Sequence, residues 1–365
     1  MNGNNAFEKD ATSVSGKGAA PGKEAASEKG AAGAPGKDAA PEKETTPKKG
    51  TAGIPENSVA NRLKAIVSGD FDEEEAQEQD ATFIADETPW QGGRVSNLVT
   101  CVRANNPSPM TYVGTNTWIV ANPEKVQGED TQAIVIDPSP EGEQTQRILD
   151  VCAEMGVKVG AIFLTHDHHD HTAGARELAN KTGAPIYGPK EEMGADAPCG
   201  PFKVDYLLQE GLLYPFEGAP IFEVYKLPGH SSDSMGLLLS EEQLMFVGDV
   251  VFRHGPTVVF YPDGNLGDYL ASLDLLEDLV KLNKVRIFCP GHGYPVTDPL
   301  RAIEATRKHR LERLDQVKEA LESGVPCNAD ALFDAVYEGV DENLRWASLR
   351  SIEAQLVYLR CNNEL

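Results

Sequence analysis

Basic side chains are scarce in this sequence of 365 residues, which holds 33 Lys and Arg against 57 Asp and Glu and carries a formal net charge of −24. Proteins that bind duplex nucleic acid or anionic membranes broadly need clustered positive charge to neutralise phosphates. The charge balance therefore argues against a membrane partner and against strong binding to duplex nucleic acid.

Cysteines are few and widely spaced. None of the six belongs to a Cys-x-x-Cys pair: they are Cys101, Cys152, Cys199, Cys289, Cys327 and Cys361. This spacing favours free thiols in a cytoplasmic protein over a disulfide framework or a thiolate zinc site. We expect Cys289 to pack in the core as a small apolar residue. The sequence also contains nothing that resembles the nucleophile elbow of serine hydrolases.

Apolar side chains are nearly missing from residues 1–57, a degenerate tract of Ala, Gly, Pro, Lys and Glu. Such a segment cannot bury enough surface to offset its ordering entropy, so we expect a disordered tail. An inert linker is favoured over a tether or a partner-binding arm. The tract has no apolar stretch typical of a signal peptide or a membrane span. Residues 58–89 follow as an acidic lead-in, with a short helix expected over 59–67.

Residues 90–299 contain the alternating pattern of a packed α/β domain, and 40% of the whole chain is hydrophobic. Apolar runs of strand length are followed by segments with helical spacing. We expect strands over 95–103, 115–120, 133–137, 161–164, 185–187, 204–208, 222–227, 235–239, 244–247 and 285–288. We expect helices over 141–155, 172–182 and 268–283.

The C-terminal residues 300–365 have a helical pattern throughout, with helices expected over 300–323, 329–336 and 343–359. Acidic residues slightly outnumber Lys and Arg here. This segment therefore lacks the basic footprint of an independent nucleic-acid binder.

A histidine-rich run, 165–171, directly follows the strand expected over 161–164, and such positions carry the chemistry of α/β sheets. His166 and His168 are two residues apart and can converge on one ion. Asp170 and His171 follow at once and can turn towards a second ion. Imidazole and carboxylate ligands suit zinc, manganese or iron, with zinc the default at a site without thiolates.

A solvated turn that binds metal only adventitiously is the alternative interpretation, and it predicts no further ligands downstream. Three such residues are present. His230 follows a Pro-Gly pair, Asp249 follows the apolar run 244–247 and Gly248, and His292 lies in a Gly-His-Gly sequence after another strand. Ligands that each follow a strand or a tight turn are what a site at one edge of a sheet requires.

Taken in this order, His-x-His-x-Asp-His, Pro-Gly-His, Gly-Asp and Gly-His-Gly resemble the metallo-β-lactamase-fold hydrolase superfamily. The resemblance implies an αββα sandwich with a dinuclear metal site on its edge. It also implies the ligands: His166, His168 and His230 for one ion, Asp170, His171 and His292 for the other, and Asp249 as the bridge.

Four further stretches, 106–111, 114–118, 261–269 and 309–313, resemble the lactamase-beta-like protein 2 group within that superfamily. The likeness runs from residue 90 to the end of the chain. It implies that 300–365 is a small winged-helix-like domain that helps to shape the active-site cleft. It further implies cleavage of phosphodiesters in single-stranded RNA.

The implied chemistry is hydrolysis by a hydroxide that bridges two divalent ions, since such ions lower the pKa of water from about 15.7 towards roughly 7. Asp170 and Asp249 are the candidate catalytic carboxylates. By formal counting, two divalent ions bring +4, and the two carboxylates with the hydroxide bring −3. About one positive charge remains in the pocket, which favours an anionic substrate.

Side chains near the predicted ligands have weaker claims. His254 and Arg253 are candidates for contact with substrate. Asp167 is a candidate to orient a ligand imidazole or to assist proton transfer. We expect His169 to be exposed and the serines at 231–232 to fix the turn after His230.

Four functions remain open at this point. A phosphodiesterase or endoribonuclease on single-stranded RNA leads, followed by a thioester or ester hydrolase of the glyoxalase II kind that acts on a small anionic substrate. A nucleic-acid-binding regulator would keep its metals for structure, but it requires a basic recognition helix that is lacking here. A redox enzyme that uses iron at the same site is the fourth.

Overall fold

The computed structural model describes residues 89–122, 131–197, 200–337, 339–340 and 342–365. The chain divides into two units, residues 1–53 and 54–365, and every described residue belongs to the second. The tail predicted over 1–57, the helix predicted over 59–67 and all but the last residue of the acidic lead-in lie outside the described residues.

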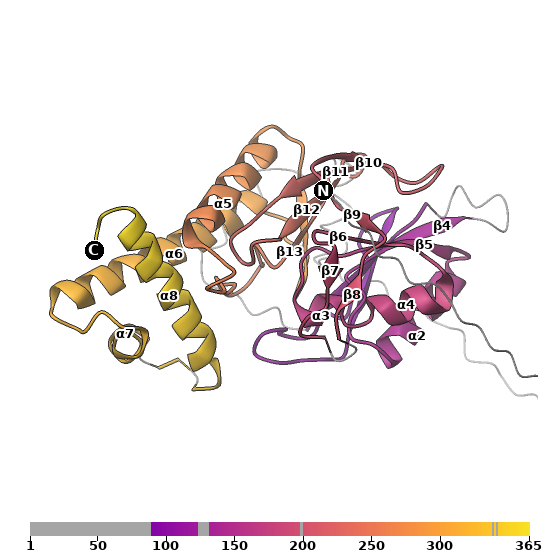
Figure 1. The fold of residues 1–365 in the computed structure, drawn as a ribbon. Coiled ribbons are helices and arrows are strands. Elements are labelled where there is room, and N and C mark those ends of the chain that lie inside the picture. The colour runs from indigo at the N-terminus through magenta and orange to yellow at the C-terminus, as the bar shows by residue number, and fades with distance from the viewer. Residues whose placement is uncertain (1–88, 123–130, 198–199, 338, 341) are drawn as a thin grey trace, which may run out of the picture. The chain divides into compact units, whose positions relative to one another are not determined.

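Two β-sheets form the centre of this second unit (Figure 1). The first has the order β1-β2-β3-β4-β5-β6-β9, with bounds β1 Gly93–Arg94, β2 Val99–Arg103, β3 Asn116–Val120, β4 Gln132–Ile136, β5 Lys158–Phe163, β6 Ile186–Gly188 and β9 Tyr206–Leu207. The second has the order β10-β11-β12-β13-β14, with bounds β10 Gly211–Leu213, β11 Phe222–Lys226, β12 Met235–Leu239, β13 Leu244–Gly248 and β14 Ile287–Pro290. A separate antiparallel pair consists of β7 (Glu192–Met193) and β8 (Phe202–Lys203).

The helices fall into two sets along the chain. The first set lies between strands and comprises α2 Glu143–Glu154, α3 His169–Thr172, α4 Ala175–Thr182 and α5 Leu266–Lys281. The second set follows β14 and comprises α6 Pro299–Glu322, α7 Ala329–Val336, the short 3-10 helix η3 Glu342–Leu344 and α8 Arg345–Cys361.

Four layers result from the way these elements bury their apolar faces. Trp118, Phe163, Phe222 and Phe246 belong to a core cluster between the two sheets. The outer face of the first sheet packs on α2 and α4 through a second cluster, and the outer face of the second sheet packs on α5 through a third (Figure 1). The predicted αββα sandwich is therefore confirmed.

Local sequence explains where the later helices begin. Asn265 accepts a hydrogen bond from the Asp268 amide at the start of α5, and Asn328 does the same for Ala331 at the start of α7. Asp298 caps α6, which has proline at its first position. Side-chain caps and a first-turn proline are strong helix start signals because they satisfy or remove orphan backbone donors.

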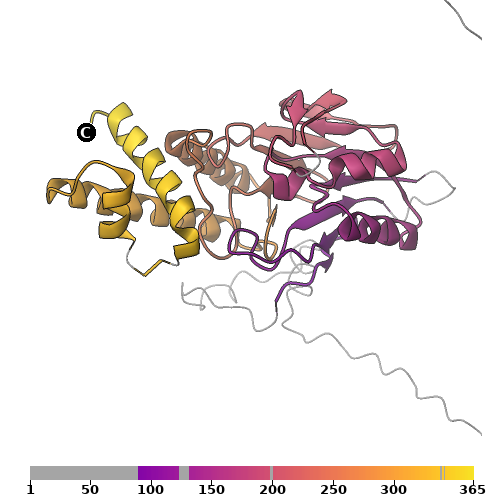
Figure 2. The same ribbon diagram turned by 60° about the horizontal axis from the view of Figure 1, so that its bottom comes forward.

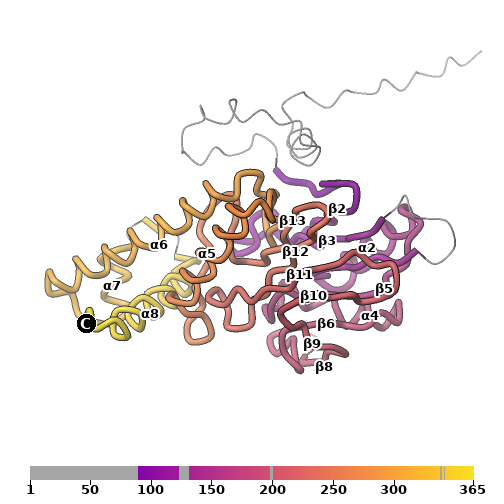
Figure 3. The backbone as a smooth tube through the Cα atoms, turned by 90° about the horizontal axis from the view of Figure 1, so that it is seen from above, coloured from indigo at the N-terminus to yellow at the C-terminus, as the bar shows by residue number. Residues whose placement is uncertain are grey.

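The C-terminal helices share a fourth cluster, which includes Leu314, Val317, Leu332 and Leu356 and also takes in Leu266 from the start of α5. In Figures 2 and 3, α7 and α8 lie together beside the later part of α6. Helices were predicted for this segment and are present. No strand occurs among the described residues after 299, so the wing of a winged-helix domain stays a prediction. Within the described part of the chain, no helix is long and apolar enough to cross a membrane.

Two predicted elements differ from the structure. The strand predicted over 95–103 is a turn followed by β2, because the Ser96 hydroxyl accepts hydrogen bonds from the amides of Leu98 and Val99. The helix predicted over 172–182 is two helices that meet at Gly174, where a Cβ atom would lie 2.4 Å from the Pro138 carbonyl oxygen. The first of these helices, α3, begins at residue 169, so Asp170 and His171 lie on a helical turn and not on an open loop.

Both sheets direct the carboxyl ends of parallel strands to the same edge. β4 and β5 are parallel neighbours in the first sheet, and β13 and β14 are parallel neighbours in the second. Backbone hydrogen bonds join the sheets there: the Met235 amide donates to the Thr165 carbonyl at 2.8 Å, and the Asn116 amide donates to the Gly291 carbonyl at 2.7 Å. This edge brings together polar residues that are far apart in the sequence.

Candidate metal centre

Three histidines converge at this edge. The His168 Nδ1 atom lies 3.1 Å from His166 Nε2 and 2.9 Å from His230 Nε2. His166 and His230 are buried, and His168 is partly buried. The three nitrogens thus point at a common position, as ligands of a single ion do.

A second group of four side chains lies beside the first. His292 Nε2 lies 3.2 Å from Asp170 Oδ2 and 3.3 Å from Asp249 Oδ2. His171 Nε2 lies 3.3 Å from Asp249 Oδ1. Asp249 Oδ2 is also 4.0 Å from His230 Nε2, so this one carboxylate faces both groups.

The backbone around these residues demands glycine at two points. At Gly229, just before His230, φ is +134° and a Cβ atom would lie 2.3 Å from the Tyr269 Cα atom. At Gly291, just before His292, a Cβ atom would lie 2.3 Å from Asp249 Oδ1 and 2.5 Å from His171 Cε1. The glycines of Pro-Gly-His and Gly-His-Gly thus let the backbone come close enough to deliver the imidazoles.

Asp137 orients two of the histidines, His171 by direct contact and His166 through Thr165, and it was not predicted from the sequence. Its Oδ2 atom lies 2.9 Å from His171 Nδ1, and its oxygens accept hydrogen bonds from the Thr165 amide and hydroxyl at 2.8 and 2.7 Å. The Thr165 hydroxyl lies 3.0 Å from His166 Nδ1. A carboxylate that accepts from one imidazole nitrogen fixes the tautomer and orients the other nitrogen towards a metal. The available signal was its position, since Asp137 follows β4 as Asp249 follows β13.

His230 is oriented by backbone and not by a carboxylate. Its Nδ1 atom donates to the Val258 carbonyl at 2.6 Å and lies 3.2 Å from the Thr257 hydroxyl. With the proton on Nδ1, the lone pair on Nε2 faces His168 and Asp249.

The two ligand groups differ in the pKa values of their histidines. Burial and the neighbouring imidazoles hold the pKa of His166 well below its ordinary value, and burial together with His168 lowers the pKa of His230 to about 4. Burial alone would also lower the pKa of His292, but Asp249 and Asp170 outweigh it and raise the pKa to about 9. Burial would raise the pKa of Asp249, yet His292 and His171 hold it well below the ordinary range. Without a metal, the first group is neutral and the second pairs imidazolium with carboxylate.

The donor set fits a divalent metal. His171 Nε2, His292 Nε2 and Asp249 Oδ1 are buried and lack a hydrogen-bond partner among the described residues, although they face one another. Leaving buried polar atoms unsatisfied costs about 1–3 kcal/mol each, and a shared cation would satisfy all three. In each group the potential ligand atoms lie within 4.8 Å of one another. Imidazole nitrogens and carboxylate oxygens are ligands for zinc, manganese and iron.

The other residues singled out in the sequence lie around this centre. The Arg253 guanidinium is 5.3 Å from the Tyr294 ring centroid, and the His254 ring is 6.5 Å from the same ring. Tyr294 comes two residues after His292 in the sequence, and contact of Arg253 and His254 with substrate stays a prediction. His169 is exposed, as expected.

Asp167 and the serines after His230 have structural contacts. Asp167 accepts a hydrogen bond from the Gly194 amide at 2.5 Å and forms an ion pair with Lys190 at 3.2 Å. The expectation that Asp167 orients a ligand imidazole is not met, because its carboxylate is engaged by these two groups. Its assistance in proton transfer stays a prediction. The Ser232 amide and hydroxyl both donate to Asp263, which fixes the turn as expected.

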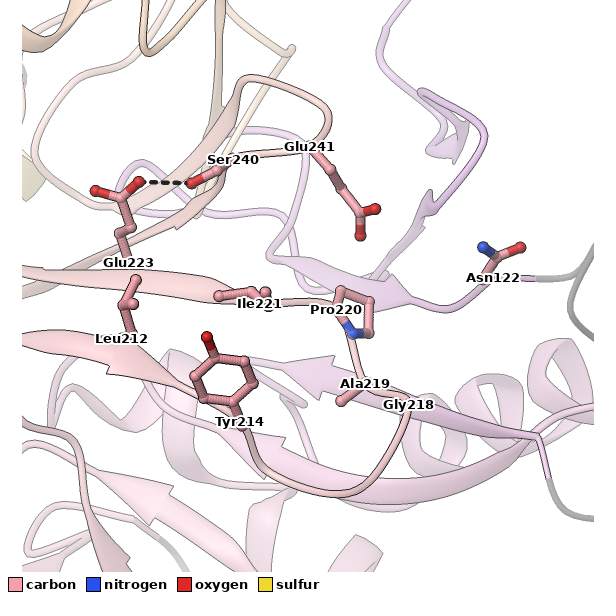
Figure 4. A pocket seen from close by; sticks show the side chains of 10 residues that line it. All are labelled: Asn122, Leu212, Tyr214, Gly218, Ala219, Pro220, Ile221, Glu223, Ser240 and Glu241. Carbon is pink, nitrogen blue, oxygen red and sulfur yellow. Dashed lines mark hydrogen bonds between the residues drawn. The ribbon is translucent and has the colours of Figure 1, made fainter.

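A pocket of about 450 Å³ opens at the other end of the sandwich (Figure 4). Its lining includes Tyr214 and Ile221, and on one side of it the Ser240 hydroxyl donates to Glu223 at 2.8 Å. β11 begins beside this pocket and runs away from it towards His230. No histidine is among its lining residues, and its position separates it from the candidate metal centre.

Metal-free protein is expected to lose stability as the pH rises from about 6.5 to about 9. The pKa of His292 is raised from 6.5 to about 9 by folding, so its contribution is fully present below 6.5 and is lost as the pH passes 9. The loss amounts to at most about 3 kcal/mol. A bound divalent ion requires the neutral imidazole, so metal binding becomes more favourable over the same range. Thermal melts of loaded and metal-free protein should show a gap in Tm that widens from pH 6.5 to 9; a gap that narrows would contradict the assignment of His292.

Comparison with known proteins supplies the family. The sequence signature of the Metallo-beta-lactamase superfamily matches residues 110–292, half of the chain. This chain belongs to the metallo-beta-lactamase superfamily. The matched segment contains all seven residues of the candidate metal centre, and membership establishes the chain as a metal-dependent hydrolase.

Relatives within the superfamily extend the match. The chain is 28% identical over 269 residues to the Beta-lactamase-like protein 2 homolog of Caenorhabditis elegans, which covers 72% of this chain and 84% of that relative. It is 33% identical over 241 residues to the Atrochrysone carboxyl ACP thioesterase of Aspergillus chevalieri, which covers 65% of this chain and 70% of that relative. The resemblance to the lactamase-beta-like protein 2 group drawn from the sequence is thereby confirmed.

Among solved structures, a Beta-lactamase domain protein from Burkholderia ambifaria superposes with a TM-score of 0.62 at 20% identity and covers 78% of this chain and 93% of that one. A metallo-beta-lactamase family protein from Thermus thermophilus gives a TM-score of 0.58 at 22% identity, and the match covers 73% of this chain and 94% of that one. At this identity the likeness establishes the fold alone.

Proposed function

We propose that this chain holds two divalent ions, with zinc as the default, and hydrolyses a thioester or ester of a small anionic acyl substrate. The observation that carries the proposal is the position of Asp249, whose two oxygens face ligand atoms of both groups at 3.3–4.0 Å. One carboxylate between two ligand sets is the arrangement that two neighbouring ions share.

Each side chain then has a role. His166, His168 and His230 would hold one ion, Asp170, His171 and His292 the other, and Asp249 both. When bound, such a pair of ions supplies Lewis acidity, lowers the pKa of water to roughly 7 and holds the substrate oxygen. Asp137 and the Val258 carbonyl keep the imidazoles of His171 and His230 in the orientation that ligation needs.

Asp170 is the candidate for moving a proton. Its side chain is 16% exposed, whereas Asp249 is 9% exposed and His171 and His292 are fully buried. The neighbouring imidazoles outweigh the effect of burial and hold its pKa below the ordinary range, so that it stays a carboxylate at neutral pH. A carboxylate oxygen at the open side of the site can accept a proton from an attacking water.

Three arguments favour a thioester over a phosphate-rich substrate. Lys190 beside the histidine-rich segment is already engaged at 3.2 Å by both Asp167 and Asp233. A thiolate leaving group, with a pKa near 8.5, needs no acid from the protein. A relative that is 33% identical bears the name of an acyl carrier protein thioesterase, which supports the same substrate class.

Single-stranded RNA is the second candidate, and the aromatic rings beside His168 favour it. The Phe260 ring lies 5.4 Å from the His168 ring and 5.6 Å from the Trp346 ring. Trp346, on α8, is 47% exposed. Unpaired bases stack on such rings at about 1–3 kcal/mol each. The C-terminal helices would then contribute a stacking surface and no basic groove.

The test offers both substrates to the same protein. Metal-loaded chain is mixed with an acyl-pantetheine thioester, and released thiol is measured; a labelled single-stranded RNA is incubated in parallel. We expect thiol release that falls by about 10²-fold or more in Asp170→Ala. RNA cleavage that depends on Asp170, without thiol release, would overturn the proposal in favour of the second candidate. In that case Trp346→Ala should weaken RNA cleavage.

A further inference from the structure

Arg310 is a buried cation on the C-terminal helix α6. Its exposed fraction is 6%, while the adjacent Leu311 is 41% exposed. Arginine is almost never fully buried without an ionic partner, because removing the charge from water is costly. Among the described residues no carboxylate forms an ion pair with Arg310, and its Nε atom has no hydrogen-bond partner. Its burial therefore needs a reason other than an ion pair.

The guanidinium reaches out of the helical cluster towards the candidate metal centre. Nη2 donates a hydrogen bond to the Thr257 carbonyl, and the guanidinium carbon lies 5.4 Å from the Tyr269 ring centroid. The Tyr269 hydroxyl in turn donates to the Val250 carbonyl at 2.5 Å, one residue after Asp249. Arg310 thus contacts two elements that flank predicted metal ligands.

Residues 257–258 are the segment that holds His230. The Thr257 hydroxyl lies 3.2 Å from His230 Nδ1, and the Val258 carbonyl accepts its proton at 2.6 Å. Residues 251–260 contain no helix or strand, so no regular ladder fixes the direction of these groups. The Arg310 hydrogen bond fixes the peptide carbonyl between them.

We propose that Arg310 is a positioning residue through which the C-terminal helices set the orientation of the His230 imidazole. The proposal rests on the proposed function in one respect, which is that His230 is a metal ligand. It explains why a charged side chain of a peripheral helix is buried beside the catalytic domain. It also gives residues 300–365 a role in the metal centre that needs no bound nucleic acid.

Two neighbouring arginines on α6 provide matched controls. Arg307 pairs with Asp274 and Glu277 of α5 at 2.8 Å. Arg313 donates to the Val336 carbonyl at 2.9 Å and lies over the Tyr337 ring. Both join α6 to other helices, and neither contacts residues 257–258. Their loss should affect stability without changing the geometry at His230.

The experiment measures metal binding and not turnover. Full-length wild type, Arg310→Met, Arg310→Lys and Arg307→Met are made metal-free. Each is titrated with Co²⁺ against a chromophoric chelator, with the visible Co²⁺ absorption recorded and the Tm measured as a check of folding. We expect Arg310→Met to raise the Kd for the ion held by His166, His168 and His230 by about 10- to 100-fold and to alter the Co²⁺ absorption band. Arg310→Lys should restore most of the affinity, and Arg307→Met should leave the Kd and the spectrum as in wild type.

A folded Arg310→Met protein with the wild-type Kd and spectrum would overturn the proposal, as would an equal loss of affinity in Arg307→Met. If Arg310→Met does not fold, Arg310→Gln takes its place, because glutamine is neutral and too short to reach the Thr257 carbonyl. His230→Ala separates this proposal from the proposed function. Wild-type affinity in His230→Ala would refute the ligand role of His230 itself.

Discussion

Asp249→Ala is expected to lose at least one bound ion and to lower kcat/KM by at least about 10³-fold, which corresponds to about 4 kcal/mol of transition-state stabilisation. Among the described residues, Asp249 is the carboxylate with ion-pair distances to both ligand groups, at 3.3 Å from His171 and His292 and 4.0 Å from His230. Its removal also takes away a carboxylate that lies 3.3 Å from the Nε2 atoms of both His171 and His292. Metal content by mass spectrometry and turnover are measured on the same sample.

Asp249→Asn is the control for shape. The amide keeps the volume and one acceptor oxygen but removes the negative charge, so we expect a loss of turnover close to that of alanine with a smaller loss of metal. An Asp249→Ala protein that retains two ions and the wild-type rate would refute the assignment of Asp249 as the shared ligand.

Asp137→Ala is expected to lower the affinity for the ion that His171 helps to hold by about 10- to 100-fold and to reduce turnover by a similar factor. The carboxylate is the partner of His171 Nδ1 at 2.9 Å and of the Thr165 amide at 2.8 Å. Without it the imidazole can rotate or take the other tautomer, and a buried amide loses its acceptor at a cost of about 1–3 kcal/mol. Metal titration of the folded variant measures the first effect, and its Tm measures the second.

Asp167→Ala is the matched control for that experiment. Asp167 is adjacent to two predicted ligands in the sequence, yet its carboxylate contacts Lys190 and Gly194. We therefore expect a much smaller change in metal affinity than in Asp137→Ala. Equal losses in the two variants would show that the contacts of Asp137 with His171 and Thr165 do not carry the effect.

Much of the site was accessible from the sequence because its ligands follow strands. His166, Asp249 and His292 each come directly after an apolar run, and the carboxyl ends of parallel strands meet at one edge. Asp137 obeys the same rule and was still missed. It belongs to none of the motifs that marked the predicted ligands, and the parallel pairing of β4 with β5 is what brings it to His171.

Other features depended on contacts that no local pattern encodes. The close packing of Gly174 on the Pro138 carbonyl separates α3 from α4, whereas one helix was predicted over 172–182, and α3 begins earlier, at residue 169. The C-terminal helices were predicted from their apolar spacing and proved to be helices. The burial of Arg310 was not predicted, because a basic residue within a helical pattern gives no sign of a partner 53 positions away.

We propose that one chain needs two divalent ions to hydrolyse its substrate. The measurement that tests it most directly is a titration of metal-free protein with Zn²⁺ while thioester hydrolysis and bound metal are followed together. We expect activity to be absent without metal and to reach its maximum at two ions per chain, when both ligand groups are filled. Full activity in the metal-free protein, or a maximum at one ion that a second does not raise, would contradict the claim.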